Sequence, residues 1–203
     1  MKALPSVRSA VFALLLSAAA GALASDASVI LFRHATAPGI GDPAHMRLGD
    51  CSTQRNLDRQ GRTQARHIGE QLRQMGVPVR AVWTSQWCRT RETAALAFPQ
   101  LRPVEQPAFN SFFGDPSGAD EQTAQARTLL QGWRGPGVLV VSTHQVNIAA
   151  LTGISPHTGE GIVVRPTAAG LQVLGRIPAP APAPVPADAH DSISKITRKK
   201  HHN

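Results

Sequence analysis

Four residues of this chain, two arginines and two histidines, follow short apolar runs and have side chains that can act on an anionic group. Arg33 and His34 come at the end of one short apolar run, His144 ends another, and Arg89 comes shortly after a third. Guanidinium groups bind phosphoryl oxygens in pairs and stay charged, and a neutral imidazole is a good nucleophile near neutral pH. Ligands of open α/β sheets bind at the carboxyl ends of the strands. We therefore expect these four side chains to meet at one edge of a sheet.

Metal binding is the competing use for two histidines at strand ends. No carboxylate or third histidine follows at ligand spacing, and Arg33 would repel a cation. We expect no metal site and no cofactor.

The elements that must position these residues alternate between strand-like and helix-like patterns. Short apolar runs predict strands, and apolar positions at spacings of three and four predict helices. The expected strands are 29–35, 79–85, 101–105 and 138–144, with a last hairpin of 161–166 and 171–175. The expected helices are one from Asp58 to Gly76, one entered through 86–94, one over 121–133 and one from Gln145. Gly61 and Gly69 in the first helix predict close packing against the sheet.

A long loop follows the strand that carries His34. It covers about 35–56 and contains five glycines and prolines. Loops of this length in a compact domain are usually functional or disordered. Since it leaves the carboxyl end of the strand, it should border the site, with Arg47, Arg55 and Asn56 as polar candidates to line it.

The first 24 residues have the pattern of a secretory signal peptide. Lys2 and Arg8 precede the apolar run 11–20, which is too short to span a bilayer, and 22–24 is a small-x-small cleavage signal. A retained anchor helix is the alternative. With no cysteine just after the cleavage site, we expect a periplasmic protein without a lipid anchor or an integral membrane span. The globular domain should cover 25–177, followed by a Pro/Ala-rich linker and basic tail over 178–203.

The net charge of +8 on 203 residues favours partners that carry phosphate. Part of this charge belongs to the leader and the tail. The sequence contains no helix-turn-helix pattern, no zinc-finger spacing and no aromatic residues interleaved with basic ones, so we expect no nucleic-acid partner.

Two cysteines, Cys51 and Cys88, are an even number in a chain expected to be exported. A disulfide between them is the hypothesis we favour, and two buried free thiols are the alternative.

Four stretches resemble motifs of the histidine phosphatase superfamily, in its phosphoglycerate mutase-like branch 1. Residues 31–35 resemble its Arg-His-Gly motif, and 84–94 resemble its Ser-Pro-Leu-x-Arg-Ala-x-Gln-Thr-Ala motif. Residues 56–65 resemble the start of its first helix, Leu-Thr-x-x-Gly-x-x-Gln-Ala, and 141–144 the strand that bears its second histidine. The resemblance extends over about 29–177.

The resemblance implies a three-layer α/β/α sandwich, with a mostly parallel central sheet and an antiparallel edge hairpin. It also implies that His34 is the nucleophile, with Arg33, Arg89 and His144 around the phosphate. Hydrolysis would pass through a phosphohistidine without a metal. Arg55 and Asn56 are further candidates for substrate binding.

The general acid of the family is the main departure. Many members carry a Glu four residues before a Gly, and counting back from Gly114 gives Asn110. Asp115 is the nearest carboxyl and our candidate acid, with a turn residue before Pro116 as the alternative reading. Glu121 is a second candidate, better explained as compensation of a helix dipole. The resemblance implies that members without this acid act on good leaving groups.

Three functions fit these observations. The first is a periplasmic phosphomonoesterase acting on a phosphorylated small molecule, for which the compartment suggests an envelope phosphosugar. The second is a mutase of the phosphoglycerate type, against which the signal peptide argues because its substrates are cytosolic. The third is a non-catalytic phosphate-binding module of the same fold.

Overall fold

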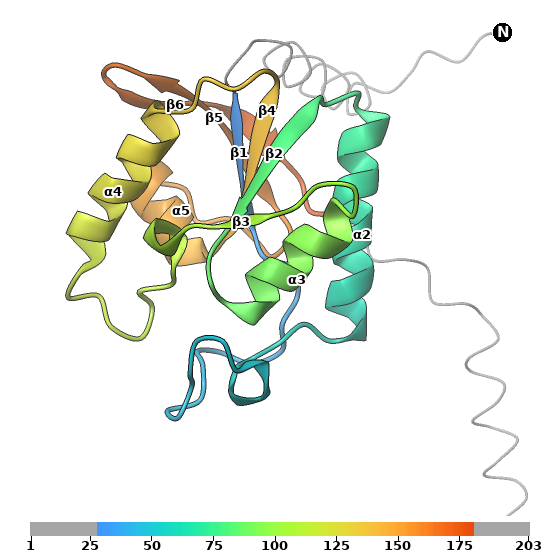
Figure 1. Ribbon diagram of the computed structural model, residues 1–203, viewed down its shortest axis with the longest axis vertical. Helices are drawn as coiled ribbons and strands as arrows, with labels where there is room; N and C mark the ends of the chain where they lie inside the picture. The colour runs from blue at the N-terminus through green and yellow to red at the C-terminus, as the bar shows by residue number, and fades with distance from the viewer. Residues whose placement is uncertain (1–27, 181–203) are drawn as a thin grey trace, which may run out of the picture.

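The computed structural model describes residues 28–180. The predicted signal peptide, and all but the first three residues of the predicted linker and tail, lie outside this range. The described part is an α/β fold with one six-stranded mixed sheet flanked by four helices (Figure 1).

The sheet has the strand order β3-β2-β4-β1-β5-β6. Neighbours among the first four are parallel, whereas β5 runs antiparallel to β1 and pairs with β6 as a hairpin. The mostly parallel sheet with an antiparallel edge hairpin is thus confirmed. The strands are β1 (Val29–Arg33), β2 (Val79–Thr84), β3 (Val104–Glu105), β4 (Val138–Thr143), β5 (Gly161–Thr167) and β6 (Gly170–Ile177).

Strand β3 is shorter than the predicted 101–105. Pro103 has no N–H to give to a ladder and marks the point before which no pairing occurs. The hairpin is longer than predicted at both strands. Its turn uses only Ala168 and Ala169, and β6 continues to Ile177, which pairs with Gly161.

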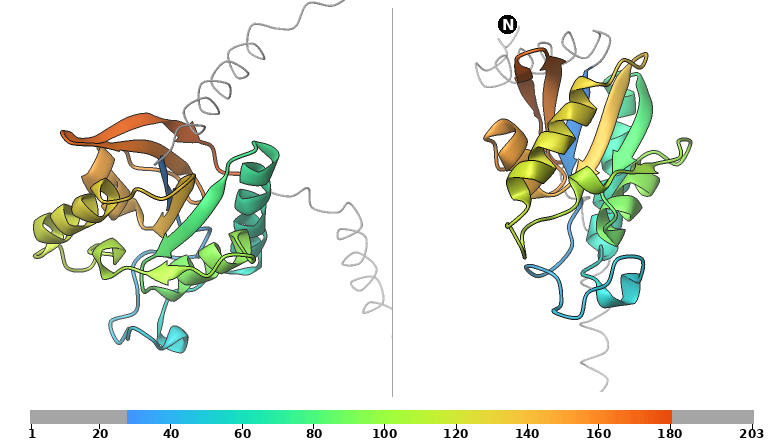
Figure 2. Two further views of the ribbon diagram at one scale, coloured as in Figure 1. Left: turned by 45° about the horizontal axis from the view of Figure 1, so that its top comes forward. Right: turned by 60° about the vertical axis from the view of Figure 1, so that its left-hand side comes forward.

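The helices form the outer two layers. Helices α2 (Arg59–Gln74) and α3 (Cys88–Ala97) cover one face of the sheet, and α4 (Ala119–Gln131) and α5 (Gln145–Thr152) cover the other (Figure 2). Helix α4 is shifted by two residues toward the N-terminus from the predicted 121–133, since it is N-capped by Gly118 and C-capped by Gly132.

Alternate residues of the central strands fill the two halves of the core. In β1, Ile30 and Phe32 pack with α2 and α3, whereas Val29 and Leu31 pack with α4 and α5. Every residue from Val138 to Thr143 in β4 is buried. A strand buried on both faces reads as a continuous apolar run, which is why β1 and β4 were recognisable from the sequence.

Helix α2 approaches its neighbours closely at two glycines. A Cβ on Gly61 would lie 1.9 Å from the carbonyl oxygen of Thr36, and a Cβ on Gly69 would lie 1.9 Å from that of Ala97. The close packing predicted for these glycines is present, but it is directed at the loop after β1 and at the end of α3 rather than at the sheet.

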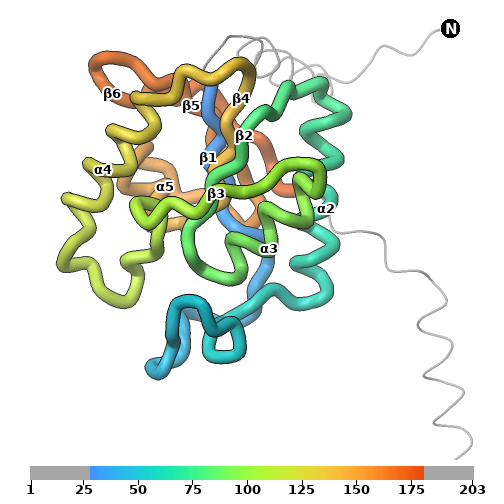
Figure 3. Tube along the Cα trace, viewed as in Figure 1, coloured from blue at the N-terminus to red at the C-terminus, as the bar shows by residue number. Residues whose placement is uncertain are grey.

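The carboxyl ends of β1, β2 and β4 point to the same end of the molecule. There the chain between β1 and α2, residues 34–58, extends beyond the sheet as a long loop that contains the short 3-10 helix η1 (Cys51–Thr53) (Figure 3). We call this segment the rim loop. A second loop, 110–118, joins the 3-10 helix η2 (Pro107–Phe109) to α4.

Candidate active site

His34 is the first residue after β1 and is 3% exposed. Its backbone N–H donates to the carbonyl of Thr143 at 2.9 Å, which continues the pairing of β1 with β4. Its ring lies with Nδ1 2.8 Å from the carbonyl oxygen of Ala35 and Nε2 3.2 Å from Nε of Arg89. Since a carbonyl only accepts and a guanidinium only donates, the proton is on Nδ1 and the lone pair is on Nε2.

His144 follows β4 and faces His34, with the ring centroids 5.5 Å apart. Its Nδ1 lies 3.5 Å from a terminal nitrogen of Arg89, and its Nε2 lies 2.9 Å from Oγ of Ser85. Nε2–H therefore donates to Ser85. The hydroxyl of Thr90 donates to the carbonyl oxygen of Trp87 at 2.7 Å, so Ser85 donates to Oγ1 of Thr90, also at 2.7 Å. This chain of hydrogen bonds fixes the orientation of the second imidazole.

Arg89 lies in the first turn of α3 and is 2% exposed. One edge of its guanidinium, formed by Nη1 and Nη2, donates to both carboxylate oxygens of Asp42 at 2.7 and 3.0 Å. The other edge, Nε and Nη2, points at the nitrogen lone pairs of His34 and His144. An arginine has two edges that can grip an oxyanion, and here one is held by Asp42 and the second faces the gap between the histidines.

Asp42 belongs to the rim loop, yet its side chain is only 17% exposed. Besides Arg89 it accepts from the indole N–H of Trp87 at 2.9 Å and from the backbone N–H of Arg55 at 3.2 Å. Burial alone would raise the pKa of Asp42, but the hydrogen bond and charge of Arg89, together with Trp87, lower it below its usual value. Asp42 is thus a fixed anion that orients Arg89.

The electrostatics of the site keep both histidines neutral. Burial, and then the charge of Arg89, lower the pKa of His34 to about 3. Burial, followed by His34 and Arg89, lowers the pKa of His144 well below its usual value. A neutral imidazole with its lone pair on Nε2, as in His34, can act as a nucleophile, and cations around it stabilise a transferring phosphoryl group.

Two further arginines line the same cavity. Arg33 donates from Nη1 to the carbonyl oxygen of Pro156 at 3.0 Å, and its buried Nε has no hydrogen-bond partner among the described residues. Arg55 is tied to the rim loop by donating to the carbonyl oxygens of Gly41, at 2.7 Å, and Ala37. Both remain available as cations around an anion bound beside His34.

The structure contains the Cys51–Cys88 disulfide, which joins η1 to the start of α3. Gln54 reinforces this link, because its side-chain carbonyl accepts the backbone N–H of Cys88 at 2.9 Å. Cys88 immediately precedes Arg89. The rim loop is therefore attached beside Arg89 at two points, through the disulfide and through Asp42.

Asn110, at the position where the resemblance places the family's acid, holds two loops together instead. The side chain of Asn110 exchanges hydrogen bonds with Gln86, at 2.9 Å from each group. Asp115 lines the cavity but is exposed, and it accepts the backbone N–H of Ser117 at 3.0 Å in a turn. Hydrogen bonds from Ser117 lower the pKa of Asp115, which is opposite to what a general acid requires.

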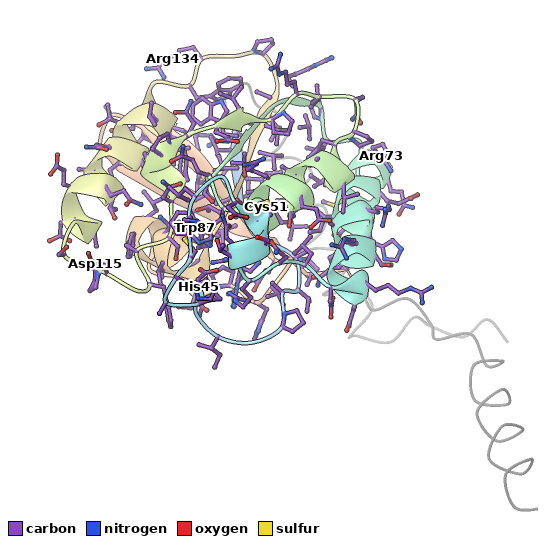
Figure 4. The ribbon with its side chains drawn as sticks, turned by 60° about the horizontal axis from the view of Figure 1, so that its bottom comes forward. His45, Cys51, Arg73, Trp87, Asp115 and Arg134 are labelled. Atoms are coloured by element: carbon purple, nitrogen blue, oxygen red, sulfur yellow. A yellow bond between two sulfur atoms is a disulfide. The ribbon has the colours of Figure 1, made fainter. Side chains whose placement is uncertain are left out.

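Not all predicted binding residues reach the cavity. The amide of Asn56 donates to the carbonyl oxygens of Cys51 and Gln54, and Arg47 pairs with Asp50 at 2.7 Å. Neither residue lines the cavity that contains His34, whereas Arg55 does. Figure 4 shows this end of the molecule, with Trp87 near its centre and Asp115 and His45 farther out.

Sequence reasoning missed Asp42 and Ser85. Asp42 was overlooked because nothing in its local pattern separates it from Asp50 in the same loop. The available signal was the need for an anion near several arginines, since a buried cation is rarely left unpaired. Ser85 ends the second predicted strand at the level of His144, and its place at a strand end was the usable hint.

Two negative observations complete the description. Within residues 28–180, no group of three or more His, Cys, Asp and Glu side chains is arranged to hold a metal ion. No helix in the same range is long and apolar enough to cross a membrane.

The carboxyl ends of the parallel strands β1 and β4 bring two neutral histidines against an arginine that is held by a carboxylate. This arrangement defines an α/β protein with an oxyanion-binding centre. The chain belongs to the histidine phosphatase superfamily (branch 1), whose family model matches residues 29–140. This membership supports a function of the phosphatase type. A comparison with curated proteins found no match.

Solved structures of low identity share the fold. The protein histidine phosphatase SixA complexed with tungstate is 17% identical, with 75% of this chain and 97% of that chain covered at a TM-score of 0.54. Rv3214 from Mycobacterium tuberculosis is 16% identical, with coverages of 73% and 96% and a TM-score of 0.54. A mutant of phosphoserine phosphatase from Entamoeba histolytica, in complex with phosphoserine, is 12% identical, with coverages of 73% and 95% and a TM-score of 0.54.

Proposed function

We propose that this protein is a metal-independent phosphatase that hydrolyses a phosphomonoester through a phosphohistidine on His34. The observation that carries the proposal is the arrangement of Arg89. Its inner edge faces the lone pairs of His34 and His144, and its outer edge is held by Asp42. A phosphoryl group entering between the histidines would take over the two inner N–H donors. The lone pair on Nε2 of His34 would then be free to attack.

The reaction has two displacements at phosphorus. In the first, Nε2 of His34 forms a bond to phosphorus while the bond to the leaving oxygen breaks and its electron pair leaves with that oxygen. In the second, water attacks phosphorus, its proton passes to solvent or to phosphate, and the P–N bond breaks to restore the lone pair. The N–H at Nδ1 stays hydrogen-bonded to the carbonyl of Ala35, which holds the ring in place through both steps.

The absence of a suitable acid restricts the leaving group. Of the carboxylates that line the cavity, Asp42 is engaged by four donors and Asp115 by Ser117, and the pKa of each is lowered. Neither is suited to protonate a leaving oxygen near neutral pH. A substrate whose leaving group departs as a stable anion fits this site better than a simple alkyl ester.

The proposed location is the periplasm, following export by the predicted signal peptide. The Cys51–Cys88 disulfide supports this location, since disulfides persist in oxidising compartments. A phosphorylated small molecule is the proposed substrate, and an envelope phosphosugar is the candidate that the compartment suggests. Comparing the purified periplasmic fraction with cytosol for the processed chain tests the location.

The experiment is hydrolysis of 4-nitrophenyl phosphate by purified protein, with and without EDTA, beside His34→Ala. We expect activity that EDTA leaves unchanged and that His34→Ala lowers by about 10⁴-fold or more. His45→Ala is the matched control, because His45 is an exposed histidine of the rim loop, and it should keep full activity.

Rapid acid-free quenching with labelled substrate should trap phosphate on the wild-type chain but not on His34→Ala. Equal rates for the wild type and His34→Ala would refute the proposal. Tight phosphate binding without turnover would instead identify a phosphate-binding module.

A further inference from the structure

The mouth of the cavity carries exposed apolar side chains on two separate loops. Ile40 of the rim loop is 91% exposed, and Phe113 of the 110–118 loop is 59% exposed. Both line the cavity that contains His34. The two loops approach each other here, since a Cβ on Gly41 would lie 3.9 Å from Cε1 of Phe113.

Single exposed hydrophobic residues need no explanation, but a cluster on one cavity does. Met46 and Val146 lie on the same cavity and are partly exposed. We call Ile40, Met46, Phe113 and Val146 the apolar rim. It joins contributions from the rim loop, the 110–118 loop and α5, so it is not one face of a single element.

The cavity is much larger than a phosphoryl group needs. Its volume is about 1070 Å³, in the size range of sites that bind a whole small molecule. The groups placed to bind a phosphoryl group, Arg33, Arg89 and the two histidines, lie at its floor. The apolar rim and smaller apolar residues form the walls above them, with Ser111, Gln145 and Ser155 as the uncharged polar side chains among them.

In-line displacement places the leaving group on the far side of phosphorus from the nucleophile. With Nε2 of His34 at the floor, whatever is esterified to the phosphoryl group must extend toward the apolar rim. The two carboxylates that could otherwise bind sugar hydroxyls are already engaged, Asp42 by Arg89 and Asp115 by Ser117.

We propose that the apolar rim binds an apolar leaving group, so that the substrates are phosphomonoesters of phenols that carry apolar substituents rather than of polyhydroxylated sugars. The inference rests on the proposed function and narrows its substrate class. It disfavours the envelope phosphosugar that the compartment alone suggests.

The test uses 4-alkylphenyl phosphates with methyl, propyl, butyl and hexyl groups, below the concentrations at which they aggregate. Their phenols have closely similar acidity, so the chemical step is matched and only apolar size changes. Each methylene that enters the apolar rim should raise kcat/KM by up to about fourfold, which is a burial free energy of about 0.8 kcal/mol converted at 25 °C. Glucose 1-phosphate should be hydrolysed more slowly than the methyl compound.

Variants locate the effect. Ile40→Ser and Phe113→Ser should flatten the increase of kcat/KM with chain length. Val104→Ser is the control, because Val104 is an exposed hydrophobic residue on β3 that does not line this cavity, and it should keep the wild-type dependence. A rate independent of chain length, or the same dependence in Phe113→Ser as in the wild type, would overturn the inference.

Binding separates this inference from the proposed function. Calorimetry with butyl- and hexylphosphonate, which cannot be hydrolysed, measures the affinity of the apolar rim for an alkyl chain without catalysis. If no phosphate ester is hydrolysed but hexylphosphonate binds several-fold tighter than butylphosphonate, the phosphatase proposal fails and the apolar subsite stands. If esters are hydrolysed and the two phosphonates bind equally, the subsite fails and the phosphatase stands.

Discussion

At the floor of the cavity, the side chains that bind and attack the phosphoryl group come from the ends of strands and the first turn of a helix, whereas the apolar side chains at its mouth come mainly from loops. His34, Arg89 and His144 are each at most 3% exposed, and Ile40 and Phe113 are 91% and 59% exposed. The floor is fixed by strand pairing and by hydrogen bonds on both ring nitrogens of each histidine. The mouth lies outside the sheet, and its loops are held instead by side-chain hydrogen bonds such as that from Arg55 to the carbonyl oxygen of Gly41 at 2.7 Å. Chemistry can therefore be held constant by the sheet while the loops change the substrate.

Asp42 belongs to a loop at the mouth of the cavity but acts at its floor. It lies in the rim loop by sequence, between Gly41 and Pro43, but its carboxylate contacts the buried guanidinium of Arg89. The Cys51–Cys88 disulfide brings the same loop to the residue before Arg89. The rim loop thus has an inner part that belongs to the phosphoryl centre and an outer part that is free to contact the leaving group.

Among the substitutions that test this difference between floor and mouth, Arg89→Lys should have the largest effect on kcat. A lysine keeps the charge but has no second edge, so it cannot hold Asp42 and a phosphoryl group together. Loss of one such oxyanion contact costs roughly 10²- to 10³-fold in kcat. Steady-state kinetics with 4-nitrophenyl phosphate measure the loss.

Arg91→Lys is the matched control on the same helix. Arg91 pairs with Glu105 at 3.2 Å, and both side chains are about 40% exposed, at 41% and 43%. Its replacement should leave kcat within about twofold. An equal loss in both variants would mean that helix α3, and not the guanidinium edge, is what the substitution disturbs.

Asp42→Asn should have the next largest effect. The amide keeps the shape of the carboxylate but not its charge, and one of its two ends donates instead of accepting, so the grip on Arg89 is weakened. Misplacement of a group that contacts the reacting atoms costs up to about 10²-fold, and we expect kcat to fall by roughly 10- to 100-fold with a smaller change in KM.

Two measurements distinguish positioning from a general loss of structure. Asp50→Asn alters a carboxylate of the same loop that pairs with Arg47 and accepts hydrogen bonds from Ser52 at the surface. Asparagine keeps an oxygen that can accept from Ser52, so this variant should leave kcat unchanged. The double variant Arg89→Lys/Asp42→Asn should be no slower than Arg89→Lys alone, because Asp42 acts through Arg89. Full additivity of the two losses would contradict the role of Asp42.

The sequence allowed the floor of the site to be predicted because its signals are local. A continuous apolar run predicts a buried strand, and the first polar residues after it mark the strand end. This reasoning located His34 and His144, and Arg89 was expected shortly after a third strand, where a helix begins. Parallel order brings the three strand ends together. The expected pairing of the two cysteines is likewise present in the structure.

The rim could not be predicted in the same way. Asp42 and Arg89 are 47 residues apart, and the course of an irregular loop between them leaves no periodic pattern. The same lack of a pattern explains why Asn56 was expected at the cavity. Asn56 lies shortly before α2, but its side chain donates to carbonyl oxygens in the turn around η1 instead of lining the cavity. Hydrogen bonds inside a loop depend on its three-dimensional path, which residue types alone do not specify.

The pH dependence of stability should also differ between floor and mouth. The unfolded chain takes up a proton on His34 near pH 6.5, whereas the pKa of folded His34 is about 3. Between these values the unfolded state binds more protons, so the free energy of unfolding falls as the pH is lowered, by about 1.4 kcal/mol per pH unit for this histidine. The lowered pKa of His144 acts in the same direction.

Thermal unfolding between pH 7 and pH 4 measures this dependence. In His34→Gln the midpoint should fall less steeply with acidification than in the wild type, whereas His45→Gln, on the exposed rim, should follow the wild type. A wild-type midpoint that stays constant over this range would show that His34 is not held neutral by burial.

The smallest effect we expect comes from Asp115→Asn, which tests whether the mouth contains a general acid. Asp115 accepts the backbone N–H of Ser117 at 3.0 Å, and its lowered pKa leaves it ionised at the pH where an acid would act. An asparagine can accept the same hydrogen bond, so the turn survives. The substitution should change kcat for phenyl phosphate by less than about twofold. The loss of kcat with phenyl phosphate should be no larger than the loss of kcat with 4-nitrophenyl phosphate. A general acid would behave differently: its removal costs typically 10²- to 10⁴-fold, and the loss grows as the leaving group becomes more basic. Such a loss would assign Asp115 to the chemistry and would move one catalytic group from the floor to the loops.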